Sequence, residues 1–265
     1  MKKISKLLSL TLAFLMLVSV LAACSFIKSG DSDLDYIKKK GTLVVGITDF
    51  APMDYLDDNG QWIGFDADMA RAFADSLGVK AEFIEINWDN KAMELETKAI
   101  DVVWNGMTIT DEVKGLMGTS TPYCNNAQVV VVNASVADQY KDVDSIKGLS
   151  FAVENGSAGA EQLDLIGIPY TACDTQAKAL MEVAAGSVDA CVIDALMAGA
   201  MIGDGTSYPD LAYTFGLNSE EYGVGFRKGS DLVDNFNSFW KKAYDDGTVM
   251  SVAETYGVQA AIIAK

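Results

Sequence analysis

The sequence predicts an α/β protein with two lobes joined by two crossing strands. Strand-like and helix-like segments alternate along the chain, first from Gly41 and again from about Leu149. Several strand segments are continuous apolar runs, which are typical of strands buried on both faces of a parallel sheet. The segments at the C-terminal end form no sheet of their own, so we expect the chain to return there to the first lobe.

The first unit opens with a buried strand followed by an amphipathic helix. Thr42–Thr48 (TLVVGIT) is an almost continuous apolar run. Phe65–Leu77 carries one apolar stripe at helical spacing, and Gly78 is placed to end that helix. Three further elements complete the unit: a strand at Ala81–Asn87, a short helix at Lys91–Lys98 and a strand at Asp101–Trp104. Short links between such elements indicate a parallel sheet with right-handed crossovers.

The second unit repeats the pattern. Its expected strands are Phe151–Val153, Tyr170–Cys173 and Ala190–Ile193, and its expected helices are Ala158–Leu165, Thr175–Ala185 and Ala195–Ile202.

The segments that join and follow the two units set the lobe boundaries. Gln128–Val132 (QVVVV) is an apolar strand that we interpret as a crossing segment. After the second unit we expect strands at Leu211–Phe215 and Tyr222–Phe226, then helices at Leu232–Tyr244 and around Val249–Tyr256. Lobe 1 is therefore predicted to comprise residues 39–129 and 222–265, and lobe 2 residues 130–221.

The N-terminus carries an export signal. Three lysines precede the apolar run Leu7–Val20, which leads into Leu21-Ala22-Ala23-Cys24. Small residues that end directly at a cysteine resemble the lipobox of bacterial lipoproteins, which implies cleavage after residue 23 and a lipid on Cys24. The alternative is a membrane anchor, but the run is at or below the roughly 17–25 residues of a spanning helix. We expect a signal peptide at 1–23, a flexible tether at 24–38 and attachment of Cys24 to the lipid bilayer.

Composition excludes several functions. Removing residues 1–23, which hold three lysines and no acid, takes the net charge from −17 to −20. Such a surface repels nucleic acid, so we expect no nucleic-acid partner. The chain has no histidine, which excludes Ser–His and Cys–His nucleophile systems and removes the commonest metal ligand. No Cys-x-x-Cys spacing occurs, and we expect no metal and no cofactor.

Candidate binding residues follow the predicted strands, where an open parallel sheet binds its ligands. Donors at the start of the helix after Gly156, a carboxylate at Asp194 and aromatic walls together suit a zwitterion such as an α-amino acid. Each residue also has a simpler interpretation: Phe50 and Trp88 as packing, Asp194 as a helix cap and the Gly-Ser segment as a turn. The candidates are Asp49, Phe50, Trp88, Asn105, Gly106, Thr108, Ser157, Ala158 and Asp194.

Residues from about Gly41 to Gly257 resemble the family 3 extracellular solute-binding proteins, the amino-acid-binding proteins of ABC importers. The resemblance rests on motifs in the expected order: Gly64-Phe65-Asp66-Ala67-Asp68, Gly106-Met107-Thr108-Ile109-Thr110, Thr121-Pro122-Tyr123, Val188-Asp189-Ala190, Asp194 and Tyr222–Gly229. It implies a type II periplasmic-binding-protein-like fold that closes over one amino acid and presents it to a membrane permease.

The resemblance also implies roles for the candidates. Phe50 and Trp88 match positions that pack on the ligand side chain. The Gly106 carbonyl and Thr108 match hydrogen-bonding positions of lobe 1. Ser157 lies in the segment of lobe 2 that donates to the ligand carboxylate, and Asp194 matches the acceptor for the α-ammonium.

One departure concerns the ligand carboxylate. The family motif supplies an arginine that grips this group, but here Val113 stands at that position and Lys114 follows it. One helical residue is about 100° of rotation, so Lys114 is expected to point elsewhere. Three alternatives follow. Backbone N–H groups alone could hold the ligand carboxylate, another cation could bind it, or the ligand is not an ordinary α-amino acid.

The resemblance also bears on the cysteines. The strand order that it implies for lobe 2 puts Phe151–Val153 between the strands of Cys173 and Cys191. Two strand spacings of roughly 9–10 Å exceed the reach of a disulfide, so we expect free thiols.

The leading hypothesis is a monomeric, lipid-anchored binding protein on the extracytoplasmic face of the bacterial membrane, at the cell surface or in the periplasm. It would capture a polar amino acid by hinge closure and deliver it to an ABC permease. The first alternative is an enzyme of the cyclohexadienyl dehydratase type, for which Glu154 and Glu94 are the loosely placed acid–base candidates. The second is a ligand-sensing module that signals through a separate partner.

Overall fold

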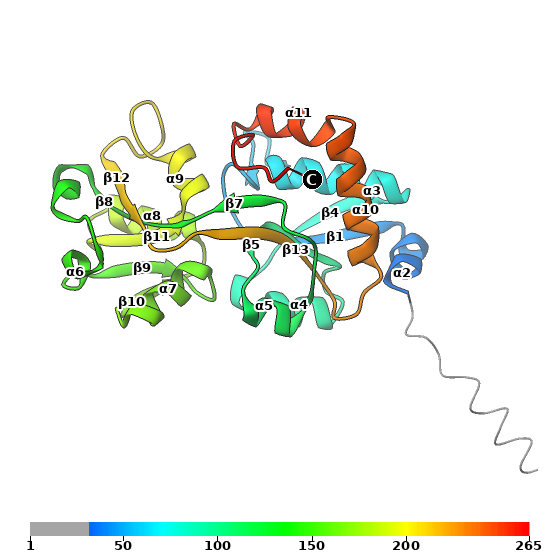
Figure 1. The fold of residues 1–265 in the computed structure, drawn as a ribbon, viewed down its shortest axis with the longest axis horizontal. Helices are drawn as coiled ribbons and strands as arrows, with labels where there is room; N and C mark the ends of the chain where they lie inside the picture. Colours follow the sequence, from blue (N-terminus) through cyan, green and yellow to red (C-terminus); the bar gives the residue numbers. More distant parts are fainter. Residues whose placement is uncertain (1–31, 265) are drawn as a thin grey trace, which may run out of the picture.

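The computed structural model describes residues 32–264, which form two α/β lobes placed side by side (Figure 1). The first sheet has the strand order β4-β1-β5-β13-β6, with β7 also paired to β13. The second sheet has the order β10-β9-β11-β8-β12. The predicted fold class, two α/β lobes joined by two crossing strands, is confirmed.

Lobe 1 combines segments from both ends of the chain. Its sheet is parallel across β4, β1 and β5 and antiparallel at β13. The strands are β1 (Thr42–Ile47), β4 (Lys80–Glu85), β5 (Val102–Thr108), β6 (Gly118–Thr119), β7 (Cys124–Asn126) and β13 (Glu220–Phe226), beside the small hairpin of β2 (Tyr55–Leu56) and β3 (Trp62–Ile63). The helices are α2 (Asp33–Lys40), α3 (Phe65–Leu77), the 3₁₀ helix η1 (Trp88–Asn90), α4 (Lys91–Glu96), α5 (Asp111–Leu116), α10 (Leu232–Asp245) and α11 (Thr248–Thr255).

Lobe 2 is continuous in sequence. Its strands β10, β9 and β11 are parallel, whereas β8 and β12 run antiparallel to their neighbours. The strands are β8 (Gln128–Asn133), β9 (Phe151–Glu154), β10 (Tyr170–Cys173), β11 (Ala190–Asp194) and β12 (Leu211–Gly216). The helices are the 3₁₀ helix η2 (Ala134–Gln139), α6 (Val143–Ile146), α7 (Ala158–Ile166), α8 (Gln176–Ala184) and α9 (Ala195–Met201).

The chain changes lobe at two short segments. β7 belongs to the first sheet and β8 to the second, so the first passage occurs at Ala127. Gln128–Val132 therefore lies inside the second sheet rather than between the sheets. The return passage is the segment 217–219 between β12 and β13. The residue-level lobe boundaries given above stay a prediction.

An aromatic cluster fills the core of lobe 1 where α3 and α10 pack on β5. The Trp104 ring lies 4.9 Å from Phe236 and is fully buried. Phe73 meets Phe236 edge to face at 5.5 Å. Aromatic pairs in this geometry stabilise a core beyond the area they bury. The predicted amphipathic stripes of α3 and α10 thus pack against each other and against β5.

The free-thiol prediction is confirmed. Cys124, Cys173 and Cys191 are all buried and unpaired. In the second sheet β9 lies between β10, which carries Cys173, and β11, which carries Cys191.

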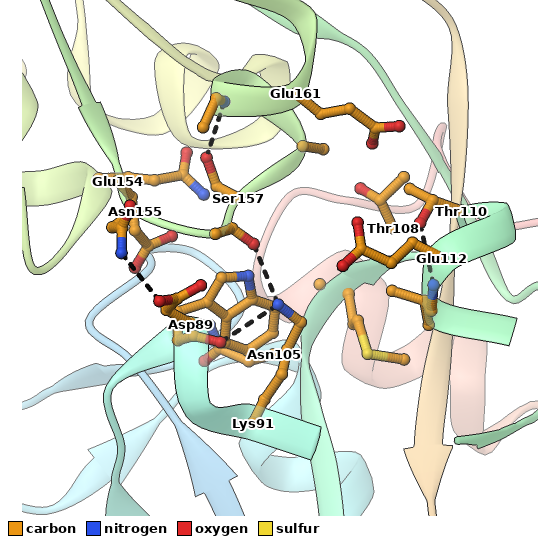
Figure 2. A pocket seen from close by; sticks show the side chains of 18 of the residues that line it. Asp89, Lys91, Asn105, Thr108, Thr110, Glu112, Glu154, Asn155, Ser157 and Glu161 are labelled. Atoms are coloured by element: carbon orange, nitrogen blue, oxygen red, sulfur yellow. Dashed lines mark hydrogen bonds between the residues drawn. The ribbon is translucent and has the colours of Figure 1, made fainter. Parts of the chain in front are cut away.

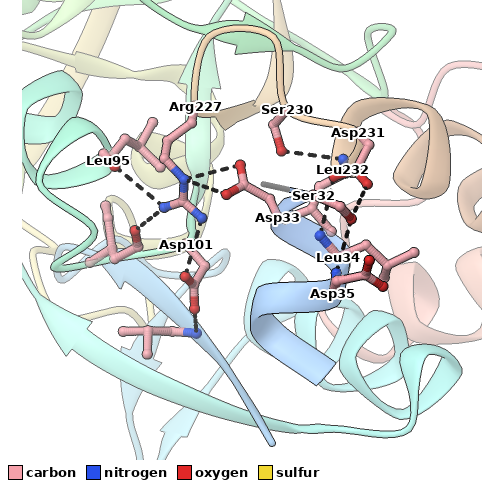
Figure 3. Close-up of polar contacts among 12 residues, drawn as sticks. Ser32, Asp33, Leu34, Asp35, Leu95, Asp101, Arg227, Ser230, Asp231 and Leu232 are labelled. Carbon is pink, nitrogen blue, oxygen red and sulfur yellow. Dashed lines mark hydrogen bonds and ion pairs between the residues drawn. The ribbon is translucent and has the colours of Figure 1, made fainter. Parts of the chain in front are cut away.

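The tether prediction is wrong for residues 33–38, which belong to helix α2 (Figure 3). The Ser32 side chain accepts from the Asp35 N–H at 3.0 Å and caps this helix, and Ile37 is fully buried. Asp33 pairs with Arg227 at 2.9 Å, which fastens the helix to the chain that follows β13. Residues 1–31 lie outside the described part of the chain, and with them the signal peptide and Cys24.

Candidate functional site

A cavity of about 360 Å³ lies between the two lobes. Such a volume is in the range of small-molecule sites. Figure 2 shows side chains from both lobes turned towards it. Its walls from lobe 1 include Trp88, Asp89, Lys91, residues 105–108, Glu112 and Val113, and those from lobe 2 include residues 154–158, Glu161, Asp164, Tyr170, Gln176 and Asp194, with Gln128 at the passage.

Seven of the nine predicted residues line this cavity: Trp88, Asn105, Gly106, Thr108, Ser157, Ala158 and Asp194. The other two do not. Asp49 is exposed at the end of β1. Phe50 is 1% exposed because a tight turn, closed by its N–H donating to the Asp54 carbonyl at 2.7 Å, directs it into lobe 1. Its ring packs edge to face on Tyr222, so the interpretation of Phe50 as a wall of the cavity is corrected to core packing.

The floor of the cavity in lobe 1 is held by buried hydrogen bonds. Asn105 accepts from the Thr48 N–H and donates to the Thr48 hydroxyl, both at 3.0 Å. The Gly106 N–H donates to the Asp66 carboxylate at 2.7 Å. Gly106 has φ +57°, and a Cβ there would lie 2.4 Å from the Phe50 ring, so the position requires glycine. These contacts fix the backbone on which Asn105, Gly106 and Thr108 are presented.

Asp194 is a buried acceptor rather than a helix cap. It occupies the N-cap position of α9, but its side chain caps no N–H of that helix. It is 4% exposed. Four side chains donate to its carboxylate: Asn126, Gln128 at 3.0 Å, Tyr222 at 2.5 Å and Gln176.

A second acid, Glu220, lies beside Asp194 and shares two of its donors. Glu220 accepts from the same two amides, Asn126 at 2.6 Å and Gln128 at 2.8 Å. Burial, and then the nearby Glu220 charge, raise the pKa of Asp194 to about 8. Asp194 lines the cavity, so a cationic group that binds beside it would favour the ionised carboxylate.

Glu154 ends strand β9 beside this region. It is 2% exposed, and its Oε1 has no hydrogen-bond partner among the described residues. Burial and the Asp194 charge raise the pKa of Glu154 to about 8, against the opposing effect of the Lys91 charge. Such a group gains from any cation that reaches it.

Lys91 is the only described cavity-lining residue with a cationic side chain. Its Nζ donates to the Trp88 carbonyl at 3.1 Å and, across the gap between the lobes, to the Gly156 carbonyl at 3.0 Å. It also lies 4.9 Å from the centre of the Trp88 ring. Burial lowers the pKa of Lys91.

A second contact joins the lobes next to Lys91. The Asn155 amide of lobe 2 donates to Asp89 of lobe 1 at 3.0 Å. With the bond between Lys91 and Gly156, this contact holds the two lobes together at the mouth of the cavity (Figure 2). The described conformation is therefore a closed one.

Residues 43–259 match the sequence model of the bacterial extracellular solute-binding proteins, family 3. The chain belongs to this family. The L-cystine-binding protein TcyJ of Escherichia coli (strain K12) is 30% identical, over 91% of this chain and 92% of that protein.

Two solved structures are similar to this solute-binding protein. The arginine-bound form of truncated ArgBP from T. maritima is 35% identical with a TM-score of 0.74, over 78% of this chain and 99% of that one. The ancestral amino acid-binding protein AncCDT-1, a precursor of cyclohexadienyl dehydratase, is 33% identical with a TM-score of 0.77, over 85% and 99%.

Other groups of this solute-binding protein's cavity were not among the predicted ligand-binding residues. Lys91 and Asp89 lie on helices, and only the meeting of the lobes brings them to the cavity. Gln176 was missed because it begins α8 rather than ending a strand. Val113, at the position expected for arginine, is 7% exposed and adds an apolar surface to the wall. Among the described residues, no helix is both long and apolar enough to cross a bilayer.

The ligand-free solute-binding protein is expected to lose stability as the pH rises from 5.5 to 8.5. The folded pKa is raised to about 8 for Asp194 and Glu154 and to about 7 for Asp66, chiefly by burial, whereas unfolded carboxyls titrate near 4. The folded state then holds more protons, so the free energy of unfolding is highest below about pH 4 for these groups and falls as they ionise. Because the chain has no histidine, few other groups titrate in this window.

Urea unfolding at pH 5.5, 7.0 and 8.5 measures this loss. The Asp194→Asn variant serves as the comparison and should show a shallower decline. A free energy of unfolding that is constant or rises across the window would contradict the shifted pKa values.

Proposed function

We propose that this protein captures an amino acid between its lobes and delivers it to an ABC importer. The observation that carries the proposal is the cavity between the lobes, which has a buried acceptor, Asp194, on lobe 2 and a cation, Lys91, on lobe 1. Opposite charges on opposite lobes suit a zwitterion that bridges them. The names of the relatives, which bind cystine and arginine, support the same class of ligand.

The ligand's α-ammonium is proposed to bind at Asp194 and its carboxylate at Lys91. Two of the three Lys91 N–H groups donate to carbonyls, which leaves one for a carboxylate. The N-terminus of α7, which begins at Ala158 and is capped by Ser157, faces the same cavity and favours an anion. Lys91 would then supply the positive charge that Val113 cannot.

Closure is proposed to report occupancy to the permease. Groups of both lobes line one cavity, so a ligand that contacts all of them does so only when the lobes meet. Binding then shifts the population towards the closed state. The role needs no bond to be broken, and Glu94, the second acid–base candidate for a dehydratase, is not among the residues that line the cavity.

The anchoring of the protein remains part of the proposal. Cleavage after residue 23 and lipid on Cys24 would hold a monomer on the extracytoplasmic face of the membrane. Removal of the lipid by Cys24→Ser would release it into the medium or periplasm. Export fits a family of extracellular solute-binding proteins.

Thermal shift and calorimetry against a panel of amino acids test the binding function. At about 100 times its dissociation constant, a true ligand adds roughly 2.7 kcal/mol of stability. Asp194→Asn should remove most of the affinity for amine-bearing ligands, and Lys91→Met should weaken carboxylate-bearing ligands by roughly tenfold or more, because each leaves a buried ligand charge unpaired.

Two outcomes would contradict the proposal. One is a panel in which no amino acid stabilises the protein. The other is release of product from prephenate or arogenate, which would instead support the dehydratase. Unchanged affinity in Asp194→Asn would show that the ammonium site has been assigned to the wrong carboxylate.

A further inference from the structure

Glu154 is a buried acid, and one of its carboxyl oxygens accepts no hydrogen bond from the described residues. Its side chain lines the cavity at 2% exposure, and Oε1 is without a hydrogen-bond partner in the described chain. A buried carboxyl oxygen without a partner lowers stability. A ligand group that donates to it would remove that cost.

Two neighbouring donors make their hydrogen bonds to other groups. Lys91 donates to the Trp88 and Gly156 carbonyls, and no ion pair within 4.0 Å joins it to Glu154 in the described residues. The Gln176 amide donates to Asp194, and its carbonyl accepts from the Asp194 N–H at 2.8 Å. Among the described residues neither side chain donates to Glu154 Oε1.

The charged residues of the cavity also favour a ligand with an extra positive charge. Among the lining residues Lys91 is matched against six acids: Asp89, Glu112, Glu154, Glu161, Asp164 and Asp194. Four of these acids are exposed and screened by solvent, whereas Glu154 and Asp194 are buried. A ligand with one ammonium and one carboxylate would occupy Asp194 and Lys91 and leave the buried Glu154 without a cation. A ligand with one more positive charge could also pair with Glu154.

We infer that Glu154 accepts a second cationic nitrogen of the ligand, so that the protein selects amino acids with a positively charged side chain or a distal ammonium. The inference rests on the proposed function, in which Asp194 takes the α-ammonium. Both carboxylates lie in lobe 2, on the neighbouring strands β9 and β11. Both line the same cavity and so offer two acceptors to a ligand with two cationic nitrogens.

Isothermal calorimetry with matched ligands tests this subsite. Arginine and citrulline have nearly the same shape, but only arginine carries a charged side chain, so arginine is expected to bind roughly 30-fold more tightly or better. Agmatine lacks the carboxylate of arginine and isolates the cationic contacts. Cystine tests a distal ammonium in place of a guanidinium.

Glu154→Gln keeps the shape of the side chain and removes its charge. It should lower the affinity for arginine by roughly 30-fold or more and the affinity for citrulline by less than about threefold. Glu96→Gln, an exposed site on α4 outside the cavity, makes the same charge change and should leave both affinities unchanged. Thermal unfolding of both variants checks that they fold.

The outcomes separate this inference from the proposed function. If citrulline binds as tightly as arginine, or Glu154→Gln weakens both equally, the cationic subsite is overturned while amino-acid binding stands. If agmatine binds and no amino acid does, the subsite stands and amino-acid capture fails. If arginine, agmatine and cystine all fail to bind, the subsite is overturned.

Discussion

Replacement of Arg227 by methionine is expected to lower the free energy of unfolding by about 3–5 kcal/mol. The Arg227 side chain is 10% exposed, and its guanidinium donates to Asp33 at 2.9 Å and to the Ile100 carbonyl at 2.8 Å (Figure 3). It also contacts the fully buried Asp101 at 3.4 Å. Methionine keeps most of the volume but leaves Asp33 buried without its cation, which is the costly part of breaking a buried ion pair.

Urea unfolding of Arg227→Met beside the wild type measures this loss. Lys241→Met is the matched control, because its ion pair with Asp245 is exposed and such pairs contribute about 0–1 kcal/mol. Limited proteolysis should also cut Arg227→Met near α2, which Asp33 fastens to lobe 1. A loss no larger than that of Lys241→Met would mean that the guanidinium adds nothing to the fold.

The same contacts explain why local sequence patterns predicted α3 but not α2. The stripe of Phe65–Leu77 and the following Gly78 are local signals, and the helix has the predicted bounds. Asp33–Lys40 is polar, and its stabilising partners, Arg227 and Asp231, lie almost 200 residues away in sequence. Local helix signals do occur there, with Ser32 as N-cap, lysines in the last turn and Gly41 after it, but without an apolar stripe they did not distinguish the segment from a polar tether.

Part of the candidate site could likewise be predicted from local sequence patterns, and part could not. The rule that ligands bind beyond the carboxyl ends of parallel strands located Trp88, Ser157 and Asp194, because strand ends can be read from sequence. Asn105 also lines the cavity, but it lies inside β5, which runs on to Thr108. The rule failed for Phe50, because a tight turn closed by the Asp54 carbonyl directs the ring inwards, where it packs on Tyr222. It could not find Lys91, because a position on α4 becomes part of the cavity only through the meeting with Gly156.

Replacement of Gly156 by alanine is expected to weaken ligand binding by roughly 5- to 150-fold, the equivalent of about 1–3 kcal/mol of overpacking. A Cβ at this position would lie 2.7 Å from Asp89 Oδ1 and 2.8 Å from Asp89 Cα. Asp89 belongs to lobe 1 and Gly156 to lobe 2, so the clash exists only when the lobes meet. The open state is unaffected by the clash, and the affinity falls because closure becomes more costly.

Backbone strain must be separated from this clash, and α7 offers the control. Gly156 has φ +68° and Gly167 has φ +71°, but a Cβ at Gly167 would have no atom within 4 Å. Both alanine variants should lose about 1–2 kcal/mol of stability from the left-handed backbone. Only Gly156→Ala should also lose affinity in calorimetry and keep a larger radius of gyration in solution scattering with saturating ligand. Equal affinities in the two variants would mean that contact between Asp89 and Gly156 is not needed to hold the ligand.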